Sequence, residues 1–124
     1  MAHFAKIENN IVVNMIVIPN EEEHRGQEFI NNELNLDGTW LQCSYNTYAN
    51  SHRLGGTPLR GNYPAVGFTY DPAKDAFIPS KPDDRPSWIL DENMLIWVPP
   101  ISMPDGEQPW HWEESEGKWV LPQN

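Results

Sequence analysis

Residues 86–100 read PSWILDENMLIWVPP, in which two tryptophans nine positions apart flank an acidic turn and prolines stand at both ends. An apolar run, a polar turn and a returning aromatic run are typical of a short β-hairpin. Nearly the same pattern returns at residues 108–122, as QPWHWEESEGKWVLP, and a weaker form precedes it at residues 66–80, as VGFTYDPAKDAFIPS. The second half of the chain therefore predicts three copies of one β-hairpin.

The three copies align position by position. Each starts with an aromatic residue, has a second large apolar residue two positions later, and has another aromatic residue seven positions after that. The sets are Phe68/Tyr70/Phe77, Trp88/Leu90/Trp97 and Trp110/Trp112/Trp119. Residues two apart on a strand share a face, and cross-strand aromatic pairs stabilise a hairpin by about 0.2–1 kcal/mol each. Because a lone two-stranded hairpin is marginal in water, we expect these copies to pack on each other or on another protein.

Prolines separate the copies. Since proline cannot donate a hydrogen bond to a sheet, these segments predict stiff, extended linkers and not central strands. We expect residues 63–124 to form a tail of tandem aromatic β-hairpins joined by proline-rich linkers. The prolines concerned are Pro79, Pro82, Pro86, Pro99, Pro100, Pro104 and Pro109.

Residues 1–62 predict a small N-terminal α+β body with a long loop. Two β-rich runs flank Asn9-Asn10, and asparagine tolerates the left-handed conformation of a tight hairpin turn. The second run, Ile11–Ile18, is rich in valine and isoleucine and predicts a central, buried strand. One modest helix is expected after its N-cap Asn20, followed by a strand at Thr39–Tyr45 and a surface loop at Asn46–Asn62. The expected fold class is thus mainly β, with one short helix.

Charge and composition exclude several classes of partner. Eight basic and 18 acidic residues give a net charge of −10, which repels phosphate backbones and anionic lipid, so we expect contact with neither nucleic acid nor membrane. Cys43 is the single cysteine, so no internal disulfide can form. No signal-peptide pattern stands at the start, which predicts synthesis in a cytoplasm.

No catalytic constellation is present in the sequence. The histidines, at positions 3, 24, 52 and 111, lack the spacing of metal ligands, and no serine lies in a nucleophile-elbow context. Cys43 lies in an apolar strand, which favours a buried, inert thiol. We therefore expect no enzyme, no cofactor and no dedicated metal site.

Four stretches carry a resemblance to a known family: MAHFAKIENNIVV at the start, TWLQCSYNT at residues 39–47, RGNYPAVGFTYDPAKDAFIP at residues 60–79, and the tryptophan-proline tail. Over nearly its whole length, the chain resembles a family of small virion-associated proteins of marine tailed phages, which infect cyanobacteria and other ocean bacteria. The resemblance implies a virion structural protein, made in the host cytoplasm and located in the virion. It also implies other virion proteins as partners, either capsid or tail subunits, and many copies per particle.

Two functional hypotheses follow. In the first, the hairpins decorate or join capsid or tail subunits, and the acidic surface keeps particles dispersed. In the second, the chain is a carbohydrate-binding module whose aromatic faces contact host surface glycans. The interaction candidates are the same for both: Trp88, Trp97, Trp110, Trp112, Trp119, Tyr70 and Phe77.

Overall fold

The computed structural model describes residues 1–122 of the chain. It is mainly β, with one short helical segment and several small antiparallel sheets. The chain packs as two units. The first holds Met1–Ser80 and Glu92–Ile96, and the second holds Lys81–Asp91 and the residues from Trp97 onward.

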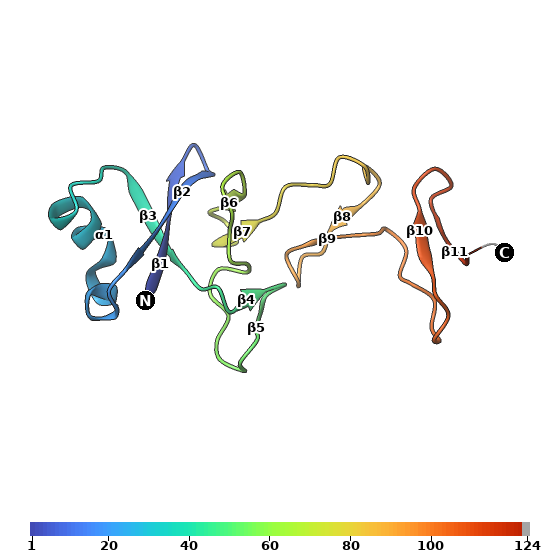
Figure 1. The fold of residues 1–124 in the computed structure, drawn as a ribbon. Coiled ribbons are helices and arrows are strands. Elements are labelled where there is room, and N and C mark those ends of the chain that lie inside the picture. The colour runs from blue at the N-terminus through green and yellow to red at the C-terminus, as the bar shows by residue number, and fades with distance from the viewer. Residues whose placement is uncertain (123–124) are drawn as a thin grey trace. The chain divides into compact units, whose positions relative to one another are not determined.

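The largest sheet belongs to the first unit and has the strand order β3-β1-β2-β6-β7 (Figure 1). Its strands are β1 (Ala2–Glu8), β2 (Ile11–Ile18), β3 (Thr39–Cys43), β6 (Thr69–Asp71) and β7 (Ala76–Ile78). Strands β4 (Thr47–Tyr48) and β5 (Ser51–His52) pair separately, as do β8 (Ile89–Leu90) with β9 (Trp97–Val98) and β10 (His111–Glu113) with β11 (Lys118–Val120).

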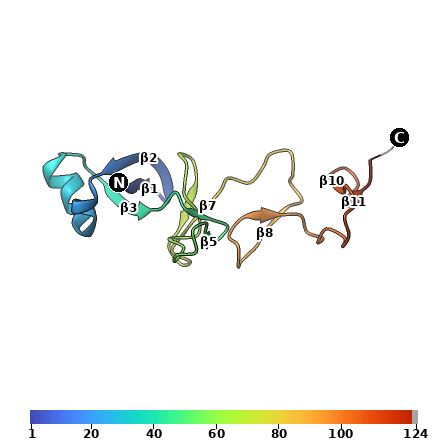
Figure 2. The same cartoon turned by 60° about the horizontal axis from the view of Figure 1, so that its bottom comes forward.

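The hairpin of β1 and β2 begins the fold, and its turn lies at Asn9-Asn10, as expected from the sequence. Asn9 and Asn10 have φ angles of 52° and 63°. Two successive left-handed residues make the turn whose twist matches paired strands, and asparagine adopts this conformation at low cost. The register shifts between Lys6 and Ile7, so a bulge interrupts the ladder. Strand β3 pairs with the other side of β1, which brings the three strands side by side (Figure 2).

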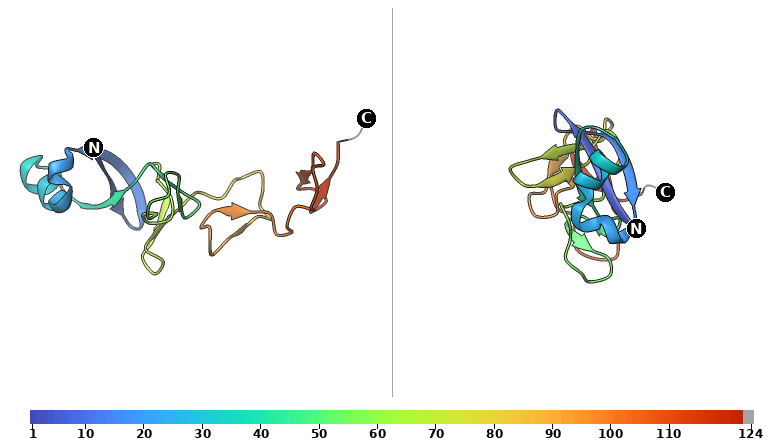
Figure 3. Two further views of the ribbon diagram at one scale, coloured as in Figure 1. Left: turned by 90° about the horizontal axis from the view of Figure 1, so that it is seen from below. Right: turned by 90° about the vertical axis from the view of Figure 1, so that its left-hand side faces the viewer.

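A short helical segment packs on one face of this sheet (Figure 3). It runs through a 3₁₀ turn η1 (Asn20–Arg25), a short α-helix α1 (Gly26–Glu28) and a π-helical turn η2 (Phe29–Glu33). Asn20 was expected to cap this segment, but Pro19 occupies the capping position and no side chain bonds there. Gly26 is required by packing, since a Cβ at that position would lie 2.0 Å from Cζ of Phe4. The helical segment is therefore fixed by contact with β1 more than by its own capping.

Both faces of the sheet carry a hydrophobic core. Successive residues of a strand point to opposite faces, so Phe4 and Ala5 contribute to different clusters. The cluster beneath the helical segment contains Phe4 with Ile18, Ile30 and Trp40. On the opposite face, residues from β6, β7 and the preceding loop cover Ala5. The buried members of that second cluster are Ala5, Val12, Cys43 and Phe77.

Two expectations about the first unit were wrong. Strand β2 is not well buried: only Val12 and Ile18 of its eight residues are buried, because its register with β6 contains a single pair, Ile11 with Thr69. The segment expected to be one long loop contains the β4–β5 hairpin, whose turn puts Ala49 and Asn50 at φ angles of 50° and 58°. Alanine rarely adopts that conformation, so Ala49-Asn50 is a weaker turn signal than Asn9-Asn10.

Asn62 joins three distant segments of the first unit. Its side chain is buried, with 1% of its surface exposed. The Nδ2 group donates hydrogen bonds to the carbonyl oxygens of Phe77 and Leu95, at 2.9 and 2.8 Å, and Oδ1 accepts one from the N–H of Ala49 at 2.9 Å. A buried amide with these partners is nearly satisfied, and its bonds to the carbonyls of Phe77 and Leu95 are themselves buried.

Replacing Asn62 by aspartate tests this connection. The Asn62→Asp variant keeps the shape of the side chain but loses both donors and places a carboxylate against two carbonyl oxygens. We expect a loss of about 2–4 kcal/mol in the free energy of unfolding, measured by chemical denaturation. The matched control is Asn50→Asp, which removes one exposed hydrogen bond to the Asn93 carbonyl and should cost less than about 1 kcal/mol. Equal losses in the two variants would contradict the role assigned to Asn62.

Candidate interaction surface

The three predicted copies have the same strand register in the structure. Tyr70 pairs with Phe77, Leu90 with Trp97, and Trp112 with Trp119. The next pairs out are Thr69 with Ile78, Ile89 with Val98, and His111 with Val120. The seven-residue spacing of the sequence therefore corresponds to one cross-strand pair in each copy.

The first copy lies inside the first unit. Strands β6 and β7 extend the five-stranded sheet, and Phe77 is completely buried in its second core cluster. Phe77 therefore has no surface with which to contact a partner, and its assignment as an interaction candidate is corrected. The structure also groups residues 63–80 with the first unit, unlike the predicted division into residues 1–62 and 63–124.

Tyr70, the other candidate in this copy, is held by a polar network beside the turn between β6 and β7. Its hydroxyl donates a hydrogen bond to Oδ1 of Asp75 at 2.6 Å, and Arg60 Nε donates to the same oxygen at 3.0 Å. The hydrogen bond from Tyr70 lowers the pKa of Asp75, and the charge of Arg60 lowers it further. Asp75 itself has a φ of 48°, which aspartate and asparagine both tolerate.

This network predicts a specific acid sensitivity. Because the pKa of Asp75 is lower in the folded state, its ionised form stabilises the fold above the unfolded pKa, and the contribution is lost as pH falls through the folded value. The stability difference between the native chain and Asp75→Asn should therefore shrink below about pH 4. Thermal melts between about pH 2 and pH 7 would measure it. A difference that stays constant over this range would contradict the prediction.

The second unit contains all five tryptophan candidates, and none of them is fully buried. Between Lys81 and Asp91, and from Trp97 to Pro122, every described residue keeps some exposed surface. The rings of Trp112 and Trp119 meet edge to face, with centroids 5.5 Å apart. Trp119 Nε1 donates a hydrogen bond to the Ile101 carbonyl at 2.7 Å. This unit is therefore held by surface-level aromatic contacts and not by a closed core.

Two basic side chains lie over tryptophan rings in the second unit. Lys81 Nζ lies 5.3 Å from the centre of the Trp97 ring, and Arg85 Cζ lies 4.8 Å from that of Trp88. Both distances are within the range of cation–π attraction. The Nε1 groups of Trp88 and Trp110 are buried and have no acceptor among the described residues.

The second unit also exposes aliphatic side chains. A unit with several half-exposed apolar groups and no interior can gain stability by burying them on another surface. The residues and their exposed fractions are Ile89 at 51%, Ile101 at 53%, Met103 at 54% and Leu121 at 40%. Together with the five tryptophans, we call these the aromatic surface.

One pocket that the sequence did not predict lies in the first unit. It has a volume of about 560 Å³ and opens beside His3 and Cys43. The His3 ring packs edge-on against Tyr45 and Tyr63, with centroids 5.3 and 5.7 Å away. Within residues 1–122, no group of three or more histidine, cysteine or acidic side chains could hold a metal ion.

The Cys43 thiol faces this region but is 2% exposed, and burial raises its pKa to about 12. At pH 8 it should therefore react with a disulfide reagent at least about a hundredfold more slowly in the native chain than in the unfolded chain. Absorbance of the released thiolate measures the two rates, with the urea-unfolded chain as the control. Comparable rates in the two states would show that the thiol is accessible.

Comparison of the chain with protein-family models, with curated protein sequences and with solved structures returned no match. In the part of the chain that the structure describes, no helix has the length and apolar character needed to cross a bilayer.

Proposed function

We propose that this protein is a phage virion structural protein, which decorates or joins capsid or tail subunits through its aromatic hairpins. One observation carries the proposal: the second unit pairs Leu90 with Trp97 and Trp112 with Trp119 at the same register, but has no fully buried described residue. Binding to another protein would bury the aromatic surface that folding leaves half exposed. The resemblance to virion-associated proteins of marine phages supports the same assignment.

In this proposal, the hairpins form a series joined by proline-rich linkers. The strands β8–β9 and β10–β11 are separated by a segment that contains Pro99, Pro100, Pro104 and Pro109. Proline restricts the backbone before binding, so a stiff linker loses less conformational entropy when its hairpins attach. Linked hairpins bind at high effective concentration once the first has attached, which raises avidity.

The tryptophans are suited to protein contacts for a further reason. Tryptophan, tyrosine and arginine are the residue types whose truncation most often weakens binding at a protein interface. The Arg85–Trp88 and Lys81–Trp97 pairs orient these rings before binding. The net charge of −10 makes DNA an unfavourable partner, so the proposed partners are proteins.

Cross-linking on purified particles tests the proposal. Each unit has two lysines, Lys6 and Lys74 in the first and Lys81 and Lys118 in the second. We expect the protein in the particle, with cross-links to other virion proteins concentrated on the second pair. Absence from the particles, or cross-links confined to the first pair, would contradict the proposal.

A variant of Trp97 tests the aromatic surface itself. Trp97→Ala should lower occupancy on particles, because loss of an interface aromatic costs about 2–4 kcal/mol of binding. Tyr48→Ala is the matched control, since Tyr48 is an aromatic residue of the first unit with 67% of its surface exposed. Quantitative mass spectrometry of reconstituted particles measures both. Equal occupancy for the native chain and the Trp97 variant would remove Trp97 from the interface.

The second candidate function is a carbohydrate-binding module that contacts host surface glycans. It is favoured by the partial exposure of all five tryptophan candidates, since an accessible ring face can stack on a sugar. Intrinsic fluorescence separates the two functions. A glycan module predicts that host polysaccharide shifts the emission and protects it from acrylamide, whereas a subunit-binding protein predicts protection by the particle and none by the polysaccharide.

A further inference from the structure

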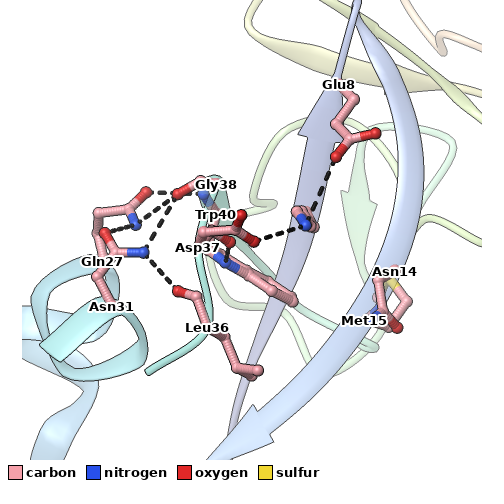
Figure 4. A network of polar contacts seen from close by, with 10 residues as sticks. Glu8, Asn14, Met15, Gln27, Asn31, Leu36, Asp37, Gly38 and Trp40 are labelled. Atoms are coloured by element: carbon pink, nitrogen blue, oxygen red, sulfur yellow. Dashed lines mark hydrogen bonds and ion pairs between the residues drawn. The ribbon is translucent and has the colours of Figure 1, made fainter. Parts of the chain in front are cut away.

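The first unit closes two of its strand edges with side chains and loop backbone. An exposed strand edge is a template for pairing with another chain, and proteins usually cover it. On β3, the N–H of Trp40 donates to Gln27 Oε1 at 2.7 Å (Figure 4). The carbonyl of Gln42, two residues further, accepts from Arg60 Nη1 at 2.8 Å. The outer edge of β3 is therefore capped.

Strand β7 is closed in a similar way. The N–H of Phe77 donates to the carbonyl of Arg60 at 2.9 Å, and the carbonyl of Phe77 accepts from Asn62 Nδ2 at 2.9 Å. Both backbone groups of the central residue of β7 are thus paired with the loop before β6. No position remains at that residue for a further strand.

Strand β2 is different. Val12 bonds through both backbone groups to Phe68 and Gly67, at 2.9 and 2.8 Å, and this is where β2 meets the segment leading into β6. Among the described residues, the strand pairing from Asn14 to Ile18 is with β1 alone. The N–H of Met15 donates to the side chain of its own neighbour, Asn14 Oδ1, at 2.8 Å (Figure 4). That donor therefore has a local partner in place of a strand.

The open edge is also apolar and uncharged. Val13 and Val17 are 37% and 44% exposed. No charged residue occurs in Ile11–Ile18, although the chain as a whole carries a net charge of −10. Two copies of so acidic a chain repel each other over most of their surfaces, and a neutral apolar edge is where that repulsion is weakest.

We propose that the edge of β2 from Asn14 to Ile18 pairs with the same edge of a second copy of this chain. Antiparallel pairing of identical strands satisfies a two-fold axis, so each copy offers the other the same backbone donors and acceptors. In a pair centred on Ile16, Met15 lies opposite the partner's Val17 on both sides of the axis, and Val13, the bulged residue of β2, lies outside the paired segment. The dimer does not depend on the virion proposal, because it uses a strand of the first unit and none of the aromatic surface.

Sedimentation velocity of the full chain tests the dimer. Between about 1 μM and 1 mM the native chain should shift from monomer to dimer. Val17→Lys puts a charge on the edge and should raise the dissociation constant by at least about tenfold. The control Leu54→Lys makes the same change in charge on a loop residue that is 73% exposed, and it should dimerise like the native chain.

Three results would overturn the proposal: a native chain that stays monomeric up to about 1 mM, a Val17→Lys variant that dimerises normally, or equal loss of dimer in both lysine variants. Hydrogen exchange gives a second readout at the backbone. Protection of the Val17 and Met15 amides should increase with concentration in the native chain and not in Val17→Lys. If Val17→Lys has a native circular dichroism spectrum, misfolding does not explain its loss of dimer.

Discussion

The carboxamide of Asn62 is the interaction on which the first unit depends. It lies in a region where three pieces of irregular backbone meet: the turn at Ala49, the strand at Phe77 and the turn at Leu95. None of these pieces forms a continuous ladder with the others, so their polar groups need a side chain that donates and accepts at once. Asparagine does both without carrying a charge into the interior. Residues 92–96 belong to the first unit, and Leu95, which is 7% exposed, lies against Gly61.

The two units differ in how they use aromatic residues. In the first unit, Trp40 and Phe77 are enclosed by residues from distant parts of the sequence. In the second, the rings of Trp112 and Trp119 pack edge to face across a short hairpin. A pair of two- or three-residue strands has too little surface to enclose a tryptophan. This difference in enclosure is why the aromatic residues of the second unit, and not those of the first, are proposed to contact a partner.

The strand edges of the first unit differ in how their backbone groups are bonded. Three side chains form hydrogen bonds with backbone groups on the outer edges of β3 and β7. They belong to Gln27, Arg60 and Asn62. Arg60 also binds Asp75, so one side chain closes β3 and supports the turn between β6 and β7. Against this background β2 differs: among the described residues its pairing from Asn14 to Ile18 is with β1 alone, and the N–H of Met15 bonds to the side chain of Asn14.

The sequence by itself determined the features that depend on local geometry. Asn9-Asn10 specified its turn, and the seven-residue spacing placed Tyr70, Leu90 and Trp112 opposite their cross-strand partners. The expectation that Cys43 is buried was confirmed, because its side chain packs in the second core cluster with Ala5, Val12 and Phe77. The mainly β composition with one short helix followed from the same patterns.

Only the tertiary structure decided which of the equivalent positions are buried. Phe77, Trp97 and Trp119 occupy the same place in the repeat, yet Phe77 alone is enclosed, because Ile11 pairs with Thr69 and brings β6 and β7 into the large sheet. The same single pair leaves the rest of β2 open. The role of Asn62 and the β4–β5 hairpin were equally invisible in the sequence. Spacing along a strand is set by neighbouring residues, whereas burial is set by segments that meet only after the chain has folded.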